Sequence, residues 1–301
     1  MIADRPAFGI LLMLGFCALA PLGDAVAKLL GETIPLGQLL AVRFAAQALL
    51  LLPIIWLSGR TLAMSPRLLR IVAVRTALHI AGIAGMFTSL RYLPLADAVA
   101  ITFVTPFIML MLGRWVLGEE VGPRRLAACI VGFVGTLLVV QPSFVDVGWP
   151  AFLPLGVAVV FSLYMLVSRH IAKEADPISL QAAGGLMATP LVVLVVWLGQ
   201  DSGAAWLQVK APDMRETLLL LAIGGLGTFA HLLMTWSLRF APSATLAPIQ
   251  YLEIPFATFI GWLIFFDLPN GLAALGIAVT MAAGLYVVHR ERRLAMVPAE
   301  S

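Results

Sequence analysis

Apolar residues along the chain fall into ten long runs, each close to the roughly 20 residues that a helix needs to cross the hydrocarbon core of a membrane. The connections between the runs are short and more polar. Membrane-spanning strands would alternate apolar and polar residues at every second position, and these runs do not. The pattern predicts an all-α polytopic membrane protein with ten transmembrane helices, at residues 8–30, 35–57, 71–90, 95–117, 124–141, 149–169, 179–199, 217–238, 243–266 and 271–289.

One sequence pattern occurs twice. L-R-Y-L-P-L-A-D-A-V-A begins at Leu90, and L-R-F-A-P-S-A-T-L-A-P begins at Leu238. Four positions match at a constant offset of 148 residues: Leu90, Arg91, Ala96 and Glu119 with Leu238, Arg239, Ala244 and Asp267. We infer two duplicated five-helix units, residues 1–145 and 146–301. Because five is odd, the second unit is inverted in the membrane, an arrangement common in secondary transporters.

The composition excludes a soluble fold, because 61% of the residues are hydrophobic and only 12% are charged, whereas soluble domains carry about 25% charged residues. The small net charge of +3 gives no indication of nucleic-acid binding. Cys17 and Cys129 lie inside predicted spans and are too isolated to form a disulfide framework or a metal site. No cofactor is expected, and the G-x-x-x-x-G-K-[ST] and H-E-x-x-H motifs are absent, which argues against ATP-driven transport and against an enzyme.

The basic residues outside the spans predict the orientation of the chain. With the N-terminus in the cytoplasm, thirteen of them lie on the inner side and four on the outer side. This is a clear positive-inside bias, so both termini are expected to be cytoplasmic. Arginine far outnumbers lysine, which is associated with bacterial genomes. We therefore expect a multi-pass protein of the bacterial inner membrane, with lipids around it.

The repeated blocks resemble the drug/metabolite transporter superfamily of the EamA type. The resemblance is carried by L-R-Y-L-P-L-A-D-A, F-V-T-P-F, L-G-E-E and G-F-V-G-T-L-L-V-V, and it covers nearly the whole chain. It implies two inverted EamA-type repeats of five helices, with a central cavity lined chiefly by the first, third and fourth helices of each half. Asp267 stands where the family has glutamate. The resemblance also implies transport of amino acids, nucleosides, riboflavin, S-adenosylmethionine or similar metabolites.

Charged residues inside predicted spans are the first candidates for binding a substrate or ion, because a charge in lipid is costly and usually faces a cavity or a partner. Asp24 is four residues before Lys28, so it can pair with Lys28 at the outer interface or face the cavity. Arg43 can clamp a substrate carboxylate or pair structurally with Asp24. Glu253 lies mid-helix and is a candidate proton carrier or binder of a substrate amine; the alternative is a neutral acid bonded to a neighbouring helix.

Two histidines are further candidates, because imidazole titrates near neutral pH. His79 and His231 are predicted at similar depths in opposite halves, with Trp236 close to His231. Arg75, four residues before His79, is expected to snorkel to the cytoplasmic interface. The structural alternative for each histidine is a hydrogen bond to a neighbour.

Polar residues beside two prolines complete the candidate site. A proline within a span frees a backbone carbonyl, so Pro106 and Pro255 are predicted to bend their helices beside the cavity. The neighbouring residues are then candidates for lining it. For Tyr164 there are two alternatives, lining the cavity or packing between helices. These candidates are Thr102, Thr105, Tyr164 and Gln250.

The sequence supports a secondary transporter of small polar or amphipathic metabolites, working by alternating access around a central cavity, with proton coupling as a further expectation. The alternative is a flippase of a lipid-linked headgroup. Small residues recur at intervals of four in the last helix of each half, which favours close helix packing within the bundle or in a homodimer. They are Ala128, Gly132, Thr136, Gly276, Thr280 and Gly284.

Overall fold

The computed structural model describes residues 5–140, 148–266 and 271–296, and within these ranges the regular structure is entirely helical. The ten predicted spans are present. They are α1 (Pro6–Gly31), α2 (Leu36–Leu57), α3 (Pro66–Ser89), α4 (Leu95–Thr102) with α5 (Thr105–Val116), α6 (Pro123–Val140), α8 (Leu153–His170), α9 (Pro177–Gly199), α10 (Met214–Phe240), α11 (Ser243–Gln250) with α12 (Glu253–Phe265), and α13 (Gly271–Met296).

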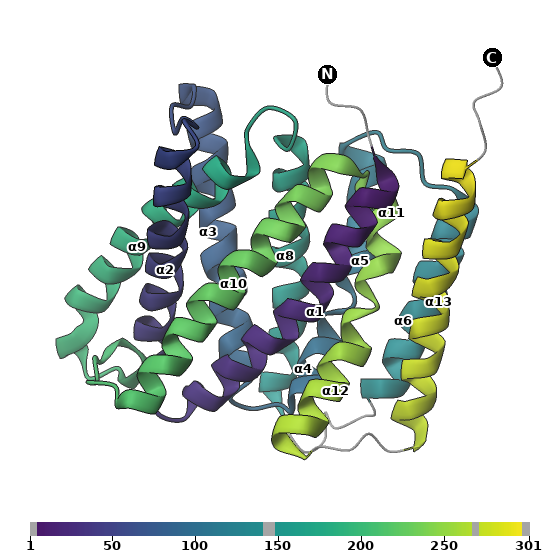
Figure 1. Cartoon of the computed structure of the whole chain (residues 1–301). Coiled ribbons are helices and arrows are strands. Elements are labelled where there is room, and N and C mark those ends of the chain that lie inside the picture. The colour runs from purple at the N-terminus through teal and green to yellow at the C-terminus, as the bar shows by residue number, and fades with distance from the viewer. Residues whose placement is uncertain (1–4, 141–147, 267–270, 297–301) are drawn as a thin grey trace.

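The two halves of the chain run in opposite directions through the bundle (Figure 1). Helix α1 begins, and α13 ends, at one end of the bundle, which we call the terminal end; the opposite end is the far end. Helix α1 runs from the terminal end to the far end, whereas α8, the first span of the second half, runs from the far end to the terminal end. The five-helix halves are therefore inverted relative to each other.

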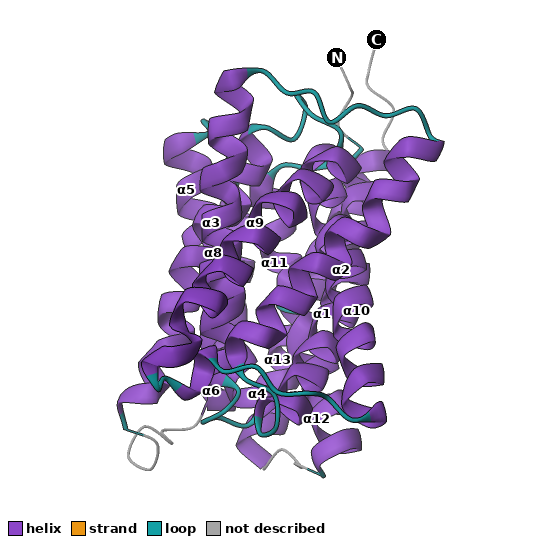
Figure 2. Cartoon of the chain, turned by 90° about the vertical axis from the view of Figure 1, so that its left-hand side faces the viewer, coloured by secondary structure: helices purple, strands orange, loops and turns teal. Residues whose placement is uncertain are grey.

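The bundle has the dimensions and surface of a membrane protein. Eight spans in the described residues are long and apolar enough to cross a bilayer, counting α4–α5 and α11–α12 as one span each; α6 and α13, packed against each other, bring the number to ten. Loops lie at the two ends (Figure 2). Exposed tryptophans mark both ends, Trp56 and Trp115 near the terminal end and Trp149 and Trp197 near the far end, as in an interfacial aromatic belt.

The fourth span of each half is broken near its middle. Helix α4 ends at Thr102 and α5 starts at Thr105, with Pro106 in its first turn. Helix α11 ends at Gln250 and α12 starts at Glu253, with Pro255 in its first turn. Each proline ring lacks the N–H that would continue the hydrogen-bond ladder, and the break turns polar groups towards the interior of the bundle.

The small-residue faces of α6 and α13 are covered within the chain. A Cβ on Gly135 would lie 2.6 Å from Thr280 Oγ1 and 2.9 Å from the Gly276 carbonyl oxygen, so the two helices pack almost backbone to backbone. A Cβ on Gly132 would meet the Tyr251 ring, and one on Gly284 would meet Leu252. A homodimer through these faces stays a prediction.

Helices α9 and α2 also approach each other closely, so adding a side chain at their contact is expected to destabilise the protein. Gly185→Ala would place its Cβ 2.9 Å from Ala48 N and 3.1 Å from the Phe44 carbonyl oxygen, backbone atoms that cannot move aside. We expect it to destabilise the protein by about 1–3 kcal/mol. Gly225→Ala, where a Cβ meets nothing within 4 Å, should be neutral or slightly stabilising. Thermal unfolding in detergent measures both, and equal effects would contradict this packing.

Candidate substrate cavity between the two halves

A cavity lies inside the bundle and extends from its middle towards the far end. Its empty volume is about 810 Å³, which includes space open to solvent at its mouth. The lining comes from α1, α2, α3 and the α4–α5 break in the first half, and from α8, α10 and the α11–α12 break in the second. Both halves therefore contribute to one cavity.

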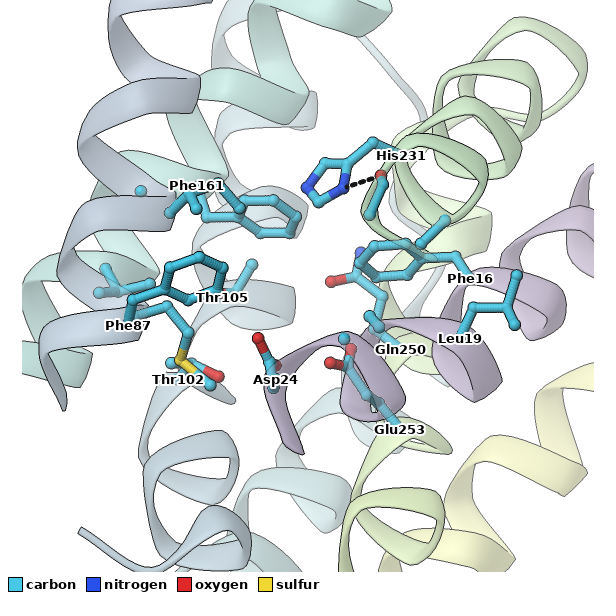
Figure 3. Close-up of a pocket in the computed structure, with 18 of the residues that line it drawn as sticks. Phe16, Leu19, Asp24, Phe87, Thr102, Thr105, Phe161, His231, Gln250 and Glu253 are labelled. Atoms are coloured by element: carbon cyan, nitrogen blue, oxygen red, sulfur yellow. Dashed lines mark hydrogen bonds between the residues drawn. The ribbon is translucent and has the colours of Figure 1, made fainter. Parts of the chain in front are cut away.

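Two carboxyl groups face the part of the cavity nearest the far end. Asp24 projects from α1 and Glu253 from the start of α12, and Figure 3 shows both side chains directed into the same space. Each is partly exposed, and within the described residues neither has a hydrogen-bonding or ion-pair partner. The predicted partner of Asp24, Lys28, instead donates to the Leu93 carbonyl oxygen at 2.8 Å. Two like charges on one cavity repel each other unless a positive group lies between them.

Aromatic rings form the walls of the cavity between its two ends. Phe16, Phe87, Phe103 and Phe161 all line it. Phe16 stacks on Phe161 with ring centroids 6.2 Å apart. Flat apolar walls of this kind bind a planar or apolar group through burial and ring stacking.

The opposite end of the cavity is basic. Arg43 on α2 is 1% exposed, and its Nη1 donates to Gln47 Oε1 at 3.0 Å. Its Nη2 lies 3.2 Å from His231 Nδ1, which is also 3.0 Å from the Gly227 carbonyl oxygen. A ring nitrogen is either a donor or an acceptor, so His231 Nδ1 cannot satisfy both neighbours. If it accepts from Arg43, the Gly227 carbonyl oxygen still has the backbone N–H of His231, four residues later in α10, as its helical partner.

A buried polar cluster closes the cavity on the side of the terminal end. Arg75 on α3 is 0% exposed and donates to Ser168 Oγ at 2.8 Å, to Tyr164 OH at 2.8 Å and to Thr235 Oγ1 at 3.2 Å. Gln181 Nε2 donates to the same Thr235 Oγ1 at 2.9 Å. The prediction that Arg75 snorkels to the interface is wrong. Hydroxyl groups of the second half surround it, so it joins the two halves.

Beyond this cluster, a largely buried salt bridge joins the halves at the terminal end. Arg169 Nε lies 3.1 Å from Glu119 Oε1, and the two side chains are 12% and 10% exposed. The Glu119 carboxylate also accepts the backbone N–H groups of Ser243 and Ala244 at 3.2 and 3.1 Å, which caps the start of α11. Glu119 therefore contacts the other half through both Arg169 and the start of α11.

The sequence matches the model of the EamA-like transporter family twice, over residues 7–141 and 148–289. The chain belongs to the EamA-like transporter family. It is 29% identical over 226 residues to a riboflavin transporter of Rhizobium johnstonii, covering 75% of this chain and 72% of that protein. It is 21% identical over 272 residues to an S-adenosylmethionine uptake transporter of Rickettsia prowazekii, covering 90% and 89%. A solved crystal structure shares the fold, with a TM-score of 0.73 over 96% of this chain and 98% of the other, at 18% identity.

Most of the predicted binding residues of this EamA-family chain come together on the cavity. Those that line it are Asp24, Arg43, Thr102, Thr105, Pro106, His231, Gln250 and Glu253. The two threonines also bond to the backbone: Thr102 Oγ1 donates to the Val99 carbonyl oxygen at 2.6 Å, and Thr105 Oγ1 to that of Ala158 at 3.3 Å.

The other predicted residues lie outside the lining. His79 is buried behind His231, with ring centroids 4.4 Å apart, and stacks on Tyr164 at 4.6 Å. Trp236 packs in an apolar cluster with residues such as Leu51 and Ile178, away from the cavity. Pro255 belongs to the helix break without lining the cavity. His79 and Tyr164 thus support the cavity from behind.

Proposed function

We propose that this protein is a secondary transporter that moves small polar or amphipathic metabolites by alternating access around the central cavity. The observation that carries the proposal is the position of the cavity, which both inverted halves line and which is closed towards the terminal end by the Arg75 cluster and the Glu119–Arg169 pair. Rocking of one half against the other would open that end and close the far end. We propose no enzymatic step and no cofactor.

The relatives guide the choice of substrates to test. Riboflavin and S-adenosylmethionine come first because transporters of these compounds match most of the chain. Amino acids and nucleosides are the other classes. All of them combine an apolar or ring-containing part with groups that form hydrogen bonds. A cavity with aromatic walls and polar ends can bind such molecules.

Proton coupling through Glu253 is part of the proposal, because this carboxyl group has no partner in the described residues and faces the cavity. We also propose a bacterial inner-membrane location with both termini in the cytoplasm, which places the terminal end inside. Residues 1–145 and 146–301 are the proposed repeats. Whether the chain works as a homodimer is open to cross-linking or mass measurement in detergent.

Transport by purified protein in sealed lipid vesicles tests the proposal. With an imposed proton gradient, we expect at least one of riboflavin, S-adenosylmethionine, an amino acid mixture or a nucleoside mixture to accumulate well above protein-free vesicles. The alternative, a flippase, predicts scrambling of a lipid-linked headgroup with no solute accumulation. That second outcome would overturn the proposal.

A further inference from the structure

The cavity has carboxyl groups at one end and a guanidinium group at the other, with apolar walls between them. Asp24 and Glu253 lie at one end and His231, beside Arg43, at the other (Figure 3). The rings of Phe16, Phe87 and Phe161 lie between. A ligand that matches this lining has a positive group at one end, a negative group at the other and an apolar part in the middle.

The polar groups at the two ends show which parts of a ligand each would bind. The carboxyl groups of Asp24 and Glu253 lack hydrogen-bonding and ion-pair partners within the described residues, and they interact electrostatically with each other. An ammonium or other cationic group between them would stabilise both carboxylates. At the basic end, the Arg43 guanidinium lines the cavity and has only neutral partners, Gln47 and His231. A carboxylate or similar acceptor would form a charge-assisted hydrogen bond with it.

The separation of the two ends sets the length of the ligand. The Phe16 ring lies edge-on to the His231 ring, with centroids 5.9 Å apart, so Phe16 marks the part of the apolar wall next to the basic end. Asp24 follows Phe16 by eight residues of the same helix, a separation of about 12 Å along its axis. Allowing for the reach of the side chains, the charged ends are on the order of 10 Å apart.

We infer that the substrate class of this cavity is an elongated zwitterion with a ring or other apolar group between its two charges. This inference rests on the proposed transport function and narrows its substrate. An α-amino acid carries both charges on one carbon and cannot reach both ends, so it binds more weakly. A neutral molecule of the same shape leaves the Asp24–Glu253 pair without a cationic partner and Arg43 without an anionic one.

Three probes distinguish the effect of ligand charge on binding affinity from the effect of ligand length. The first is the zwitterionic tripeptide glycyl-phenylalanyl-glycine, whose charges lie about 10 Å apart when extended. The second is the same peptide acetylated and amidated at its ends. The third is free phenylalanine. Binding to the purified full-length protein is measured by calorimetry in detergent. We expect the zwitterionic peptide to bind at least tenfold more tightly than either of the others.

Variants test which end of the cavity binds the ammonium group of the peptide and which end binds its carboxylate. Asp24→Asn with Glu253→Gln should remove the preference for the free ammonium group, and Arg43→Gln the preference for the free carboxylate. Because Arg43→Gln removes a buried hydrogen bond to Gln47, Arg43→Lys, which keeps the charge, is measured beside it. Glu174→Gln, at a surface ion pair with Arg67, serves as the control and should change nothing.

The outcomes distinguish this inference from the transport function. If the capped peptide or phenylalanine binds as tightly as the zwitterion, or if none of the three binds, the inference is overturned. If riboflavin or another solute is nevertheless accumulated by vesicles, the transport function stands without it. If the vesicles take up neither the zwitterionic peptide nor any of the metabolites, both the inference and the proposed transport function are overturned.

Discussion

Glu253→Gln is expected to reduce gradient-driven uptake at least tenfold and to remove its dependence on the imposed proton gradient. The carboxyl group of Glu253 faces the cavity and has no partner in the described residues, so it can take up and release a proton or hold a cationic group. Glutamine has nearly the same size but cannot do either. Uptake by sealed vesicles at several pH values measures the effect.

The matched control for this variant lies at the surface. Glu120→Gln changes an exposed carboxylate at the terminal end and should leave uptake at the wild-type level. Thermal unfolding confirms that Glu253→Gln is folded. Uptake by Glu253→Gln that keeps the wild-type pH profile would remove Glu253 from the mechanism.

Glu119→Gln is expected to destabilise the protein by about 3 kcal/mol, because it leaves the largely buried Arg169 guanidinium without its anionic partner. The amide can still accept a hydrogen bond from the start of α11, so the loss of charge is the main change. The pair joins the loop after α5 of the first half to α8 of the second. Its loss should therefore also favour opening of the terminal end.

Thermal unfolding in detergent measures the stability. The opening is measured by the labelling rate of a cysteine introduced at Ser237 in α10, which is fully buried in this structure, with Cys17 and Cys129 replaced by alanine. Glu120→Gln again serves as the control, because Glu120 is its exposed neighbour in the chain. If Glu119→Gln and Glu120→Gln behave alike, the salt bridge does not hold the terminal end closed.

The sequence was sufficient to predict the spans and their breaks. Runs of about 20 apolar residues can hardly form anything but helices in lipid, and Pro106 and Pro255 lie in the first turns of α5 and α12. Most polar residues inside the spans could also be assigned to the cavity, because a buried polar group in lipid needs water or a partner. Asp24, Thr102 and Glu253 follow this rule.

Contacts between distant helices could not be predicted in this way. Arg75 was expected at the interface from its distance to the helix end, yet three hydroxyl groups of the second half bind it inside the bundle. The position of Arg75 along α3 gave no indication of these partners. Similarly, Glu119 and Arg169 are 50 residues apart, and nothing local indicated that they would pair. Trp236 lies near His231 in the sequence but packs on a different side of α10.

The central claim is that solute passes through the cavity between the two halves, and filling that cavity tests it most directly. Ala20→Phe places a ring in the cavity lining, whereas Ala77→Phe adds the same ring to the exposed surface of α3. Uptake by sealed vesicles is measured for both variants after both are shown to be folded. We predict that Ala20→Phe loses uptake and that Ala77→Phe keeps it. Equal uptake by the two variants would contradict the claim.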